Sequence, residues 1–208
     1  MKNKIIIVAG DPNSINSELI FKIWKKLNNK LKKKICLIGN YELIAKQFKI
    51  IQCQIKLKKI KNIYDHFDHK YLNIINIDLK FKNPFKVSKR LASKYILKSL
   101  DLAHELSLNK NITGFINCPI NKNLLPNNNG VTEYLAYRCN VKDNSEVMLI
   151  NNKNLSVSPI TTHVDINQVT NKINPLLIKS KMFTLNKYFV KLFKKKPKIA
   201  ILGLNPHN

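Results

Sequence analysis

Arginine and acidic residues are scarce in this 208-residue chain, and their scarcity argues against a nucleic-acid partner. Arg90 and Arg138 are the only arginines among 37 basic residues, which face 12 acidic ones. The net charge of +25 would normally indicate nucleic acid, but arginine is the side chain that base edges and phosphates prefer. The lysines are scattered along the chain together with many Asn and Ile residues, as is typical of an AT-rich coding sequence. Nucleic-acid binding is therefore a minor alternative.

Paired cysteines and long apolar runs are also missing. The four cysteines are Cys36, Cys53, Cys118 and Cys139. None forms a C-x-x-C pair, so we expect free thiols in a reducing cytoplasm. The apolar stretch at residues 5–10 is too short for the core of a signal peptide, and no run reaches the length of a membrane span, about 18 residues. We expect a cytoplasmic protein with no membrane partner.

The first half of the chain alternates between strand and helix patterns. Short apolar runs at residues 5–8 and 35–38 each end at a glycine, which predicts buried strands followed by turns. Apolar residues at helical spacing follow each strand, at 19–27 and 41–48. The region 49–86 is irregular, with its best strand at 73–79. This order indicates an α/β fold.

The second half continues the alternation with more breaks. Ser88 is placed to cap a helix that extends to Leu106, and a strand at 112–117 follows it. Pro119 ends that strand, and Lys122 begins a helix. The elements predicted after this point are a hairpin around 151–154, a helix capped by Asp165 that breaks at 174–175 and resumes to 192, and a strand at 199–202.

Five histidines are the candidates for metal or acid–base chemistry. His66 and His69 lie beside Asp65 and Asp68 in a segment that is typical of an exposed loop, and His104 is a helix-surface residue. His163 and His207 each follow a predicted strand. In open α/β sheets the ligand sites lie beyond the carboxyl ends of strands, and imidazole suits Zn or Co. From position alone, His163 and His207 are candidates for sharing a divalent cation, and position does not decide whether they do.

Sequence motifs for nucleotide binding and hydrolysis are absent. The turn "GDPNSINSE" joins a strand to a helix, as a phosphate cradle does, but it holds one glycine and matches neither dinucleotide nor P-loop fingerprints. The chain also lacks the G-x-S-x-G and H-E-x-x-H motifs.

Five segments in order resemble one known family. They are "IIIVAGDPNSINSELI", "FINCPINKNLL", "GVTEYLA", "ITTHVDI" and "ILGLNPHN". Together they are similar to the motifs of the 4-hydroxythreonine-4-phosphate dehydrogenases of vitamin B6 (pyridoxal phosphate) biosynthesis, and the similarity extends from Ile5 to Asn208.

The resemblance implies an α/β/α two-lobed fold similar to the isocitrate and isopropylmalate dehydrogenase class, in a homodimer. We expect a first lobe at 1–125 and a partial second lobe at 126–208. The implied reaction is the NAD- or NADP-dependent oxidation of 4-phosphooxy-L-threonine to 2-amino-3-oxo-4-phosphooxybutanoate, which decarboxylates to 3-amino-2-oxopropyl phosphate. A divalent metal (Zn, Mg or Co) bound to the substrate hydroxyl would assist it.

By the same resemblance, His163 and His207 are metal ligands and Thr132 contacts the substrate. Asn121 and Lys122 fall in a P-x-x-K turn to which no particular role is assigned, and no catalytic residue is identified.

The chain departs from the family pattern at several positions. Val131 stands where the family has a histidine, and an unpaired polar group of the substrate there would cost about 1–3 kcal/mol. Ser14 and Asn16 replace glycines in the first turn, which we expect to restrict the backbone. The segment 123–130 is short, and family members continue beyond G-L-N-P-H, so we expect both lobes to be incomplete and to expose apolar surface. The alternative function is accordingly a non-catalytic remnant of the enzyme.

Overall fold

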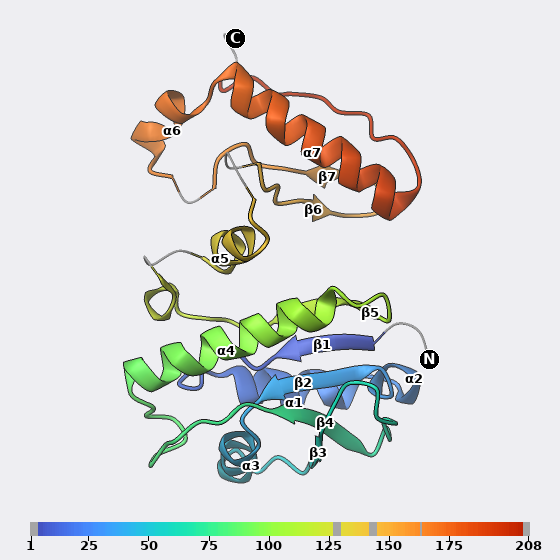
Figure 1. The fold of residues 1–208 in the computed structure, drawn as a ribbon, viewed down its shortest axis with the longest axis vertical. Helices are drawn as coiled ribbons and strands as arrows, with labels where there is room; N and C mark the ends of the chain where they lie inside the picture. The colour runs from blue at the N-terminus through green and yellow to red at the C-terminus, as the bar shows by residue number, and fades with distance from the viewer. Residues whose placement is uncertain (1–3, 127–129, 142–144, 163, 206–208) are drawn as a thin grey trace. The chain divides into compact units, whose positions relative to one another are not determined.

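The structure, a computed structural model, describes residues 4–126, 130–141, 145–162 and 164–205 (Figure 1). The chain divides into two compact units, Met1–Tyr134 and Leu135–Asn208, and each is described here by itself. The lobe boundary expected at residue 125 stays a prediction. Within the described ranges, no helix is both long and apolar enough to cross a membrane.

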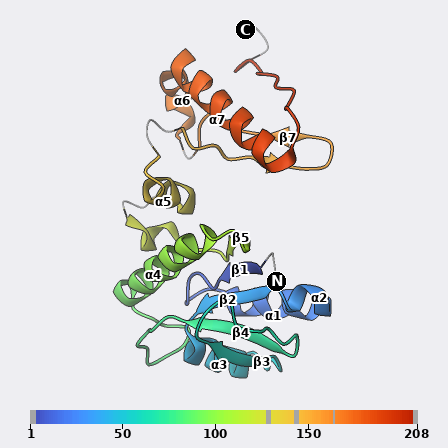
Figure 2. The same cartoon turned by 45° about the vertical axis from the view of Figure 1, so that its right-hand side comes forward.

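A parallel five-stranded sheet forms the centre of the first unit. Its strands are β1 (Lys4–Val8), β2 (Ile35–Gly39), β3 (Lys56–Ile60), β4 (Tyr71–Asn76) and β5 (Ile112–Asn117). The order across the sheet is β3-β4-β2-β1-β5, as Figure 2 shows. All five residues of β2 are buried, as a central strand covered on both faces requires. The predicted α/β class is confirmed.

Helices cover both faces of this sheet. They are α1 (Asn16–Lys26), α2 (Asn29–Lys32), α3 (Tyr41–Ile50) and α4 (Lys89–Ser107). Trp24 of α1 and Phe48 of α3 pack in a cluster with Leu37, whereas Tyr95 of α4 packs in a second cluster with Ile6. Since successive side chains of a strand point to opposite faces, the two clusters lie on the two sides of the sheet.

Helix α4 follows the apolar period that the sequence shows. It buries positions at spacings of three and four residues, namely Ala92, Tyr95, Ile96, Ser99, Leu100 and Ala103. Ser88 occupies the N-cap position in an extended conformation, as predicted, but its side chain makes no capping hydrogen bond.

The end of the first unit contains η1 (Lys122–Leu124), a single 3₁₀ turn, and α5 (Val131–Arg138), which continues into the second unit. The helix predicted to begin at Lys122 is therefore only this turn. Leu124 is buried against the cluster under α4, and its carbonyl accepts a hydrogen bond of 2.7 Å from Ser93 Oγ.

The second unit contains little buried surface. Its elements are β6 (Ile150–Asn151), β7 (Ser156–Val157), α6 (Ile166–Lys172) and α7 (Pro175–Phe193). The predicted hairpin is present as the antiparallel pair β6–β7, and Asp165 caps α6 by accepting from Asn167 N at 2.9 Å. Of the residues that the structure describes here, only Lys181 is buried.

The strand predicted at 199–202 is wrong: the described residues 195–205 contain no strand. The apolar run predicts a buried strand, but Ile201 and Leu202 are 54% and 88% exposed. A strand exists only when a neighbouring strand pairs with it. No strand of the described part of this unit does so.

Candidate functional site

The carboxyl ends of β1 and β5 meet at the point where the chain direction across the sheet reverses. Cys118 N donates to Val8 O at 2.9 Å, and Asp11 N donates to Pro119 O at 3.2 Å. The turn after β1 leads to α1 on one face, and the turn after β5 leads to η1 on the face of α4. Such a switch point is where open α/β sheets bind ligands. We call residues 9–16 and 118–122 the switch-point turns.

Gly10 allows the two turns to approach each other. Its φ of +73° lies in the left-handed region that favours glycine. A Cβ atom there would lie 2.6 Å from Asn16 Nδ2, 2.8 Å from Pro119 O and 2.9 Å from Cys118 O. Two of these atoms are backbone oxygens that cannot move aside, so the contact between the turns requires glycine.

Asn16 links the two turns with its side chain. Asn16 Nδ2 donates to Ala9 O at 2.9 Å and to Pro119 O at 2.8 Å, and lies 3.4 Å from Asp11 O. The residue is 3% exposed, and its Oδ1 has no hydrogen-bond partner among the described protein atoms. One amide group thus supplies the donor for carbonyls of both turns.

Ser14 and Asn16, which replace glycines of the family motif, are accommodated without the left-handed backbone that glycine permits. Positive φ occurs at three described non-glycine residues, Gln52, Asn140 and Lys194, so neither Ser14 nor Asn16 requires it. The Ser14 hydroxyl donates to Asp11 O at 2.9 Å. Both side chains therefore stabilise the turn through hydrogen bonds instead of straining it.

The Asp11 carboxylate is also engaged within the turn. Its Oδ1 accepts from Asn13 N at 2.9 Å, and the residue is buried. This is the hydrogen-bonding pattern of an Asx turn, which fixes the chain between β1 and α1.

Two further amide side chains hold the neighbouring loop around Pro84. Asn13 and Val87 exchange hydrogen bonds of 2.9 and 2.7 Å. Gln47 Nε2 donates to Pro12 O at 2.8 Å and to Pro84 O at 2.7 Å. No local sequence pattern marks these residues, since each partner is more than 30 positions away along the chain.

The P-x-x-K turn follows β5 directly. Asn121 Oδ1 accepts from Asn123 N at 3.0 Å and so caps η1. Lys122 is exposed beside this turn. The structure therefore gives Asn121 a structural role and leaves the Lys122 ammonium accessible to solvent.

Val131 and Thr132 lie in the first turn of α5, and both are half-buried. The Val131 side chain packs against the apolar cluster under α4. Tyr134, one turn later, packs on the same cluster and donates from its hydroxyl to Asp101 Oδ1 at 2.6 Å. The apolar surroundings account physically for a valine at this position, and the contact of Thr132 with substrate stays a prediction.

The predicted metal ligands His163 and His207 lie outside the described residues. Within the described part of the chain, no group of three or more His, Cys, Asp and Glu side chains could hold a metal. His69 Nδ1 lies 3.4 Å from Asp68 Oδ1 in a loop, and the pKa of Asp68 is lowered mainly by a hydrogen bond from Lys70 N. This agrees with the loop interpretation of residues 65–69.

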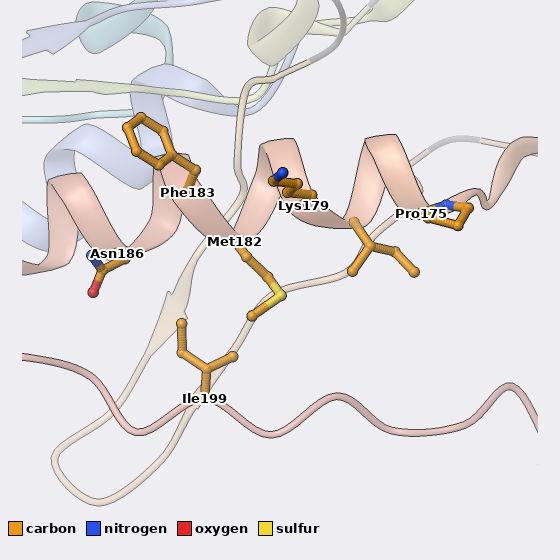
Figure 3. Close-up of a pocket in the computed structure, with 7 residues that line it drawn as sticks. Pro175, Lys179, Met182, Phe183, Asn186 and Ile199 are labelled. Atoms are coloured by element: carbon orange, nitrogen blue, oxygen red, sulfur yellow. The ribbon is translucent and has the colours of Figure 1, made fainter.

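A pocket of about 570 Å³ lies in the second unit, between α7 and the extended segment around Ile199 (Figure 3). Met182 points from the helix toward Ile199, whereas Phe183 points to the other side of the helix. The remaining lining residues are Pro175, Ile178, Lys179 and Asn186. Lys179 is the one titratable side chain among these lining residues, so they offer no acid–base pair.

Comparison with known proteins identifies the family. The model of the pyridoxal phosphate biosynthetic protein PdxA matches residues 14–208. This chain belongs to the PdxA family.

Curated PdxA relatives match almost the whole chain. A 4-hydroxythreonine-4-phosphate dehydrogenase of Sulfurihydrogenibium sp. (strain YO3AOP1) is 32% identical over 211 residues, which cover 98% of this chain and 63% of the relative. A 4-hydroxythreonine-4-phosphate dehydrogenase of Aquifex aeolicus is 30% identical over an alignment that covers 100% of this chain and 64% of the relative. The chain therefore spans slightly less than two thirds of the length of these relatives.

Solved structures show the same fold. The 4-hydroxythreonine-4-phosphate dehydrogenase of Klebsiella pneumoniae has a TM-score of 0.83 at 22% identity, covering 99% of this chain and 65% of its own. That of Burkholderia phymatum has a TM-score of 0.82 at 24% identity, covering 100% and 64%. This chain therefore shares the fold of these solved structures.

Proposed function

We propose that this chain belongs to an enzyme that oxidises 4-phosphooxy-L-threonine with NAD or NADP, as a step of vitamin B6 biosynthesis. The observation that carries the proposal is the PdxA match over residues 14–208, supported by relatives at 30–32% identity that are named for this activity.

The reaction balances as a hydride transfer followed by loss of carbon dioxide. The hydride leaves carbon 3 of the substrate for the nicotinamide ring, and the hydroxyl proton leaves to a base, which yields 2-amino-3-oxo-4-phosphooxybutanoate. The new ketone then accepts the electron pair of the breaking bond to the carboxylate, and protonation gives 3-amino-2-oxopropyl phosphate.

We further propose His163 and His207 as ligands of a divalent metal (Zn, Mg or Co). Two imidazoles suit Zn or Co, although the described residues add no cluster that completes the site. A bound cation would stabilise the substrate alkoxide and polarise the ketone.

The chain's own residues have three proposed roles. Thr132 contacts the substrate from the first turn of α5. The Val131 side chain has no polar atom and packs on the core, so the substrate group that a histidine would bind must be met by another donor or by water. The switch-point turns hold the rim of the sheet in a fixed shape. We also propose a homodimer in the cytoplasm.

An activity assay tests this proposal. The protein is purified from the cell that produces it naturally, and its intact mass is measured on the same sample. We expect reduced nicotinamide to form with 4-phosphooxy-L-threonine. The competing substrate is D-threonate 4-phosphate, because relatives from Oceanobacillus iheyensis and Fusobacterium nucleatum named for that substrate match 97% and 100% of this chain. Turnover of D-threonate 4-phosphate alone would reassign the substrate, and failure with both would favour a non-catalytic remnant.

Metal binding has a readout independent of turnover. His163→Gln and His207→Gln should each lower the zinc retained per chain in equilibrium dialysis, while His66→Gln, in the exposed loop, should not. Equal zinc retention by all three variants would contradict the proposed ligands.

A further inference from the structure

The lysines are unevenly distributed over the first unit. Residues 19–41, which include most of α1 and all of α2 and β2, contain seven lysines and no acidic residue. Helix α4, on the other face of the sheet, contains four basic and two acidic residues. Within the described residues, the one ion pair of this stretch joins Lys22 to Glu18 at 2.6 Å. A coding bias toward lysine accounts for the number of lysines but not for the lack of carboxylates beside them.

These lysines lie at the amino end of the parallel sheet. A helix that connects two parallel strands returns the chain to the end where the strands begin, so α1 and α3 both end there. Figure 1 shows α2 beside the tails of the β1 and β2 arrows, away from the arrowheads. Lys32 Nζ of α2 lies 5.4 Å from the centre of the Trp24 ring of α1. The switch-point turns are at the opposite end of the sheet, so a partner bound here would leave them open.

The end of α3 extends the same surface. Burial raises the pKa of the Cys53 thiol, and the Lys25 ammonium opposes this rise, so the end of α1 lies near the segment that follows α3. Lys49 and Ile50, the last two residues of α3, are exposed. The C-terminal ends of the two helices therefore present lysines side by side.

Large aliphatic side chains lie between the lysines. Ile23 is 50% exposed, Leu31 37% and Ile50 59%. We call the exposed residues at this end the amino-end surface, and they are Ile23, Lys25, Lys26, Lys30, Leu31, Lys33, Lys49 and Ile50.

This combination of side chains fits an anionic lipid surface. Lysine ammonium groups attract the headgroups, and exposed aliphatic side chains enter the boundary between headgroups and acyl chains. A nucleic acid would instead favour arginine forks and aromatic rings on which bases stack, and the amino-end surface contains neither.

We propose that the amino-end surface binds anionic phospholipid headgroups and attaches the protein peripherally to a membrane. Such contact needs no membrane-spanning segment, so the expectation of no membrane partner, which follows from the lack of a long apolar run, does not bear on it. Asp65 O accepts from Lys4 Nζ at this end of the sheet, but the loop that contains Asp65 and Asp68 packs through Ile63 and Phe67 on the α4 cluster, on the other face. The inference does not depend on the proposed function.

Sedimentation with lipid vesicles provides the test. Vesicles of phosphatidylcholine alone are compared with vesicles in which about one third of the lipid is phosphatidylserine. We expect the protein to sediment with the phosphatidylserine vesicles and not with the others. Raising the salt from about 0.1 M to about 1 M should lower the partition coefficient at least about tenfold, because charges are screened over a shorter distance.

Two pairs of lysine substitutions separate this surface from net charge. Lys30→Gln combined with Lys33→Gln should lower the partition coefficient at least about tenfold. Lys94→Gln combined with Lys98→Gln is the matched control, because both lysines are exposed on α4 and the change in net charge is the same. The control pair should lower the partition coefficient less than about twofold, since these lysines do not face the lipid.

A pair of isoleucine substitutions tests the apolar part of the contact. Ile23→Gln should weaken vesicle binding about threefold or more, because its side chain would no longer enter the boundary region. Ile116→Gln, at a side chain that is 60% exposed on β5, should leave binding unchanged.

Four results would overturn the proposal. Three are failure to sediment with the phosphatidylserine vesicles, equal binding to both kinds of vesicle, and equal losses from the two lysine pairs, which would show that net charge alone attracts the protein. The fourth is salt-sensitive retention on RNA that the Lys30→Gln and Lys33→Gln pair abolishes, in a protein that does not bind the vesicles. That result would assign the amino-end surface to nucleic acid.

Discussion

Asn16 illustrates how a single side-chain amide can hold two turns together. Its Nδ2 atom lies among carbonyl oxygens of both switch-point turns, so the group at this position must be a hydrogen-bond donor. A side chain of the same shape that can only accept hydrogen bonds would place its negative oxygen against these carbonyl oxygens, which are also negative. The contact between the two switch-point turns therefore depends on the identity of one terminal atom, Asn16 Nδ2.

Asn16→Asp is expected to lower the free energy of unfolding by about 3–5 kcal/mol at neutral pH, because it leaves an uncompensated buried charge. The folded state should raise the pKa of the introduced carboxyl above its usual value of about 4. The loss of unfolding free energy should therefore shrink as the pH falls from this raised pKa toward about 4, where the carboxyl is protonated in both states. Urea unfolding at several pH values measures this. Asn28→Asp is the control: Asn28 Oδ1 only accepts a bond, from Leu31 N at 2.9 Å, and a carboxylate can do the same.

Cys36 should make the fold sensitive to alkali. Burial in β2 raises the pKa of its thiol to about 12, whereas an unfolded thiol titrates near 8.5. The stabilisation from keeping the folded thiol neutral is complete below the unfolded pKa and is lost as the pH rises toward 12, at up to about 1.4 kcal/mol per pH unit. Cys36→Ala should flatten the alkaline decline in unfolding free energy, and Cys139→Ala, at an exposed thiol, should not. Equal slopes in both variants would contradict this assignment.

At the scale of elements, the N-cap positions of α3 and α4 differ. The side chain at the first makes a capping hydrogen bond, whereas the side chain at the second does not. Asn40 Oδ1 accepts from Leu43 N at 2.8 Å, and its Nδ2 donates to Ile77 O at 2.8 Å, so it both begins α3 and holds the chain after β4. Ser88 stands at the corresponding position of α4 without a capping bond.

Asn40→Ala should therefore cost about 2 kcal/mol of unfolding free energy, since a cap and a second buried hydrogen bond are lost. Ser88→Ala should cost less than about 0.5 kcal/mol, as is usual for exposed sites. Denaturant unfolding of the two variants measures both losses of unfolding free energy. A Ser88→Ala loss as large as that of Asn40→Ala would mean that the serine caps α4 in solution.

The elements that were predictable from the sequence are those specified by local patterns. Residues 5–8 and 88–106 carry a strand run and a helical period within one short window, and both are confirmed. The strand predicted at 199–202 is wrong because its existence depends on a partner strand, which no local pattern encodes.

The site was predictable only through motifs. The turn at 10–16 resembles a family segment, but the hydrogen bond from Asn16 to Pro119 spans 103 positions and follows from the tertiary fold alone. The sequence indicates that Val131 lacks the hydrogen-bond donor that a histidine provides. The packing of α5 shows that the Val131 side chain contacts the apolar core instead.

At the scale of the whole molecule, the two units differ in how their longest helices are supported. Helices α4 and α7 have the same length, 19 residues. Helix α4 buries six side chains, five of them apolar or aromatic, whereas the described part of α7 buries only Lys181, whose Nζ donates to Glu146 O at 2.6 Å. Since helices in proteins owe most of their stability to packing, equal length does not give equal stability.

We therefore expect amide hydrogens in the middle of α7 to exchange at least about a hundredfold faster than those of α4 in the isolated 208-residue chain, a difference of about 2.7 kcal/mol in opening free energy. Each fully buried large apolar side chain contributes about 1.5–3 kcal/mol, so the contrast in burial is large enough to produce it. Hydrogen exchange read by mass spectrometry on peptides of the two helices measures the ratio. Capping does not account for it, because Asn174 caps α7 by accepting from Leu177 N at 2.9 Å while α4 has no side-chain cap. Equal exchange in the two helices would contradict this prediction and would show that α7 is covered by apolar surface within the chain itself.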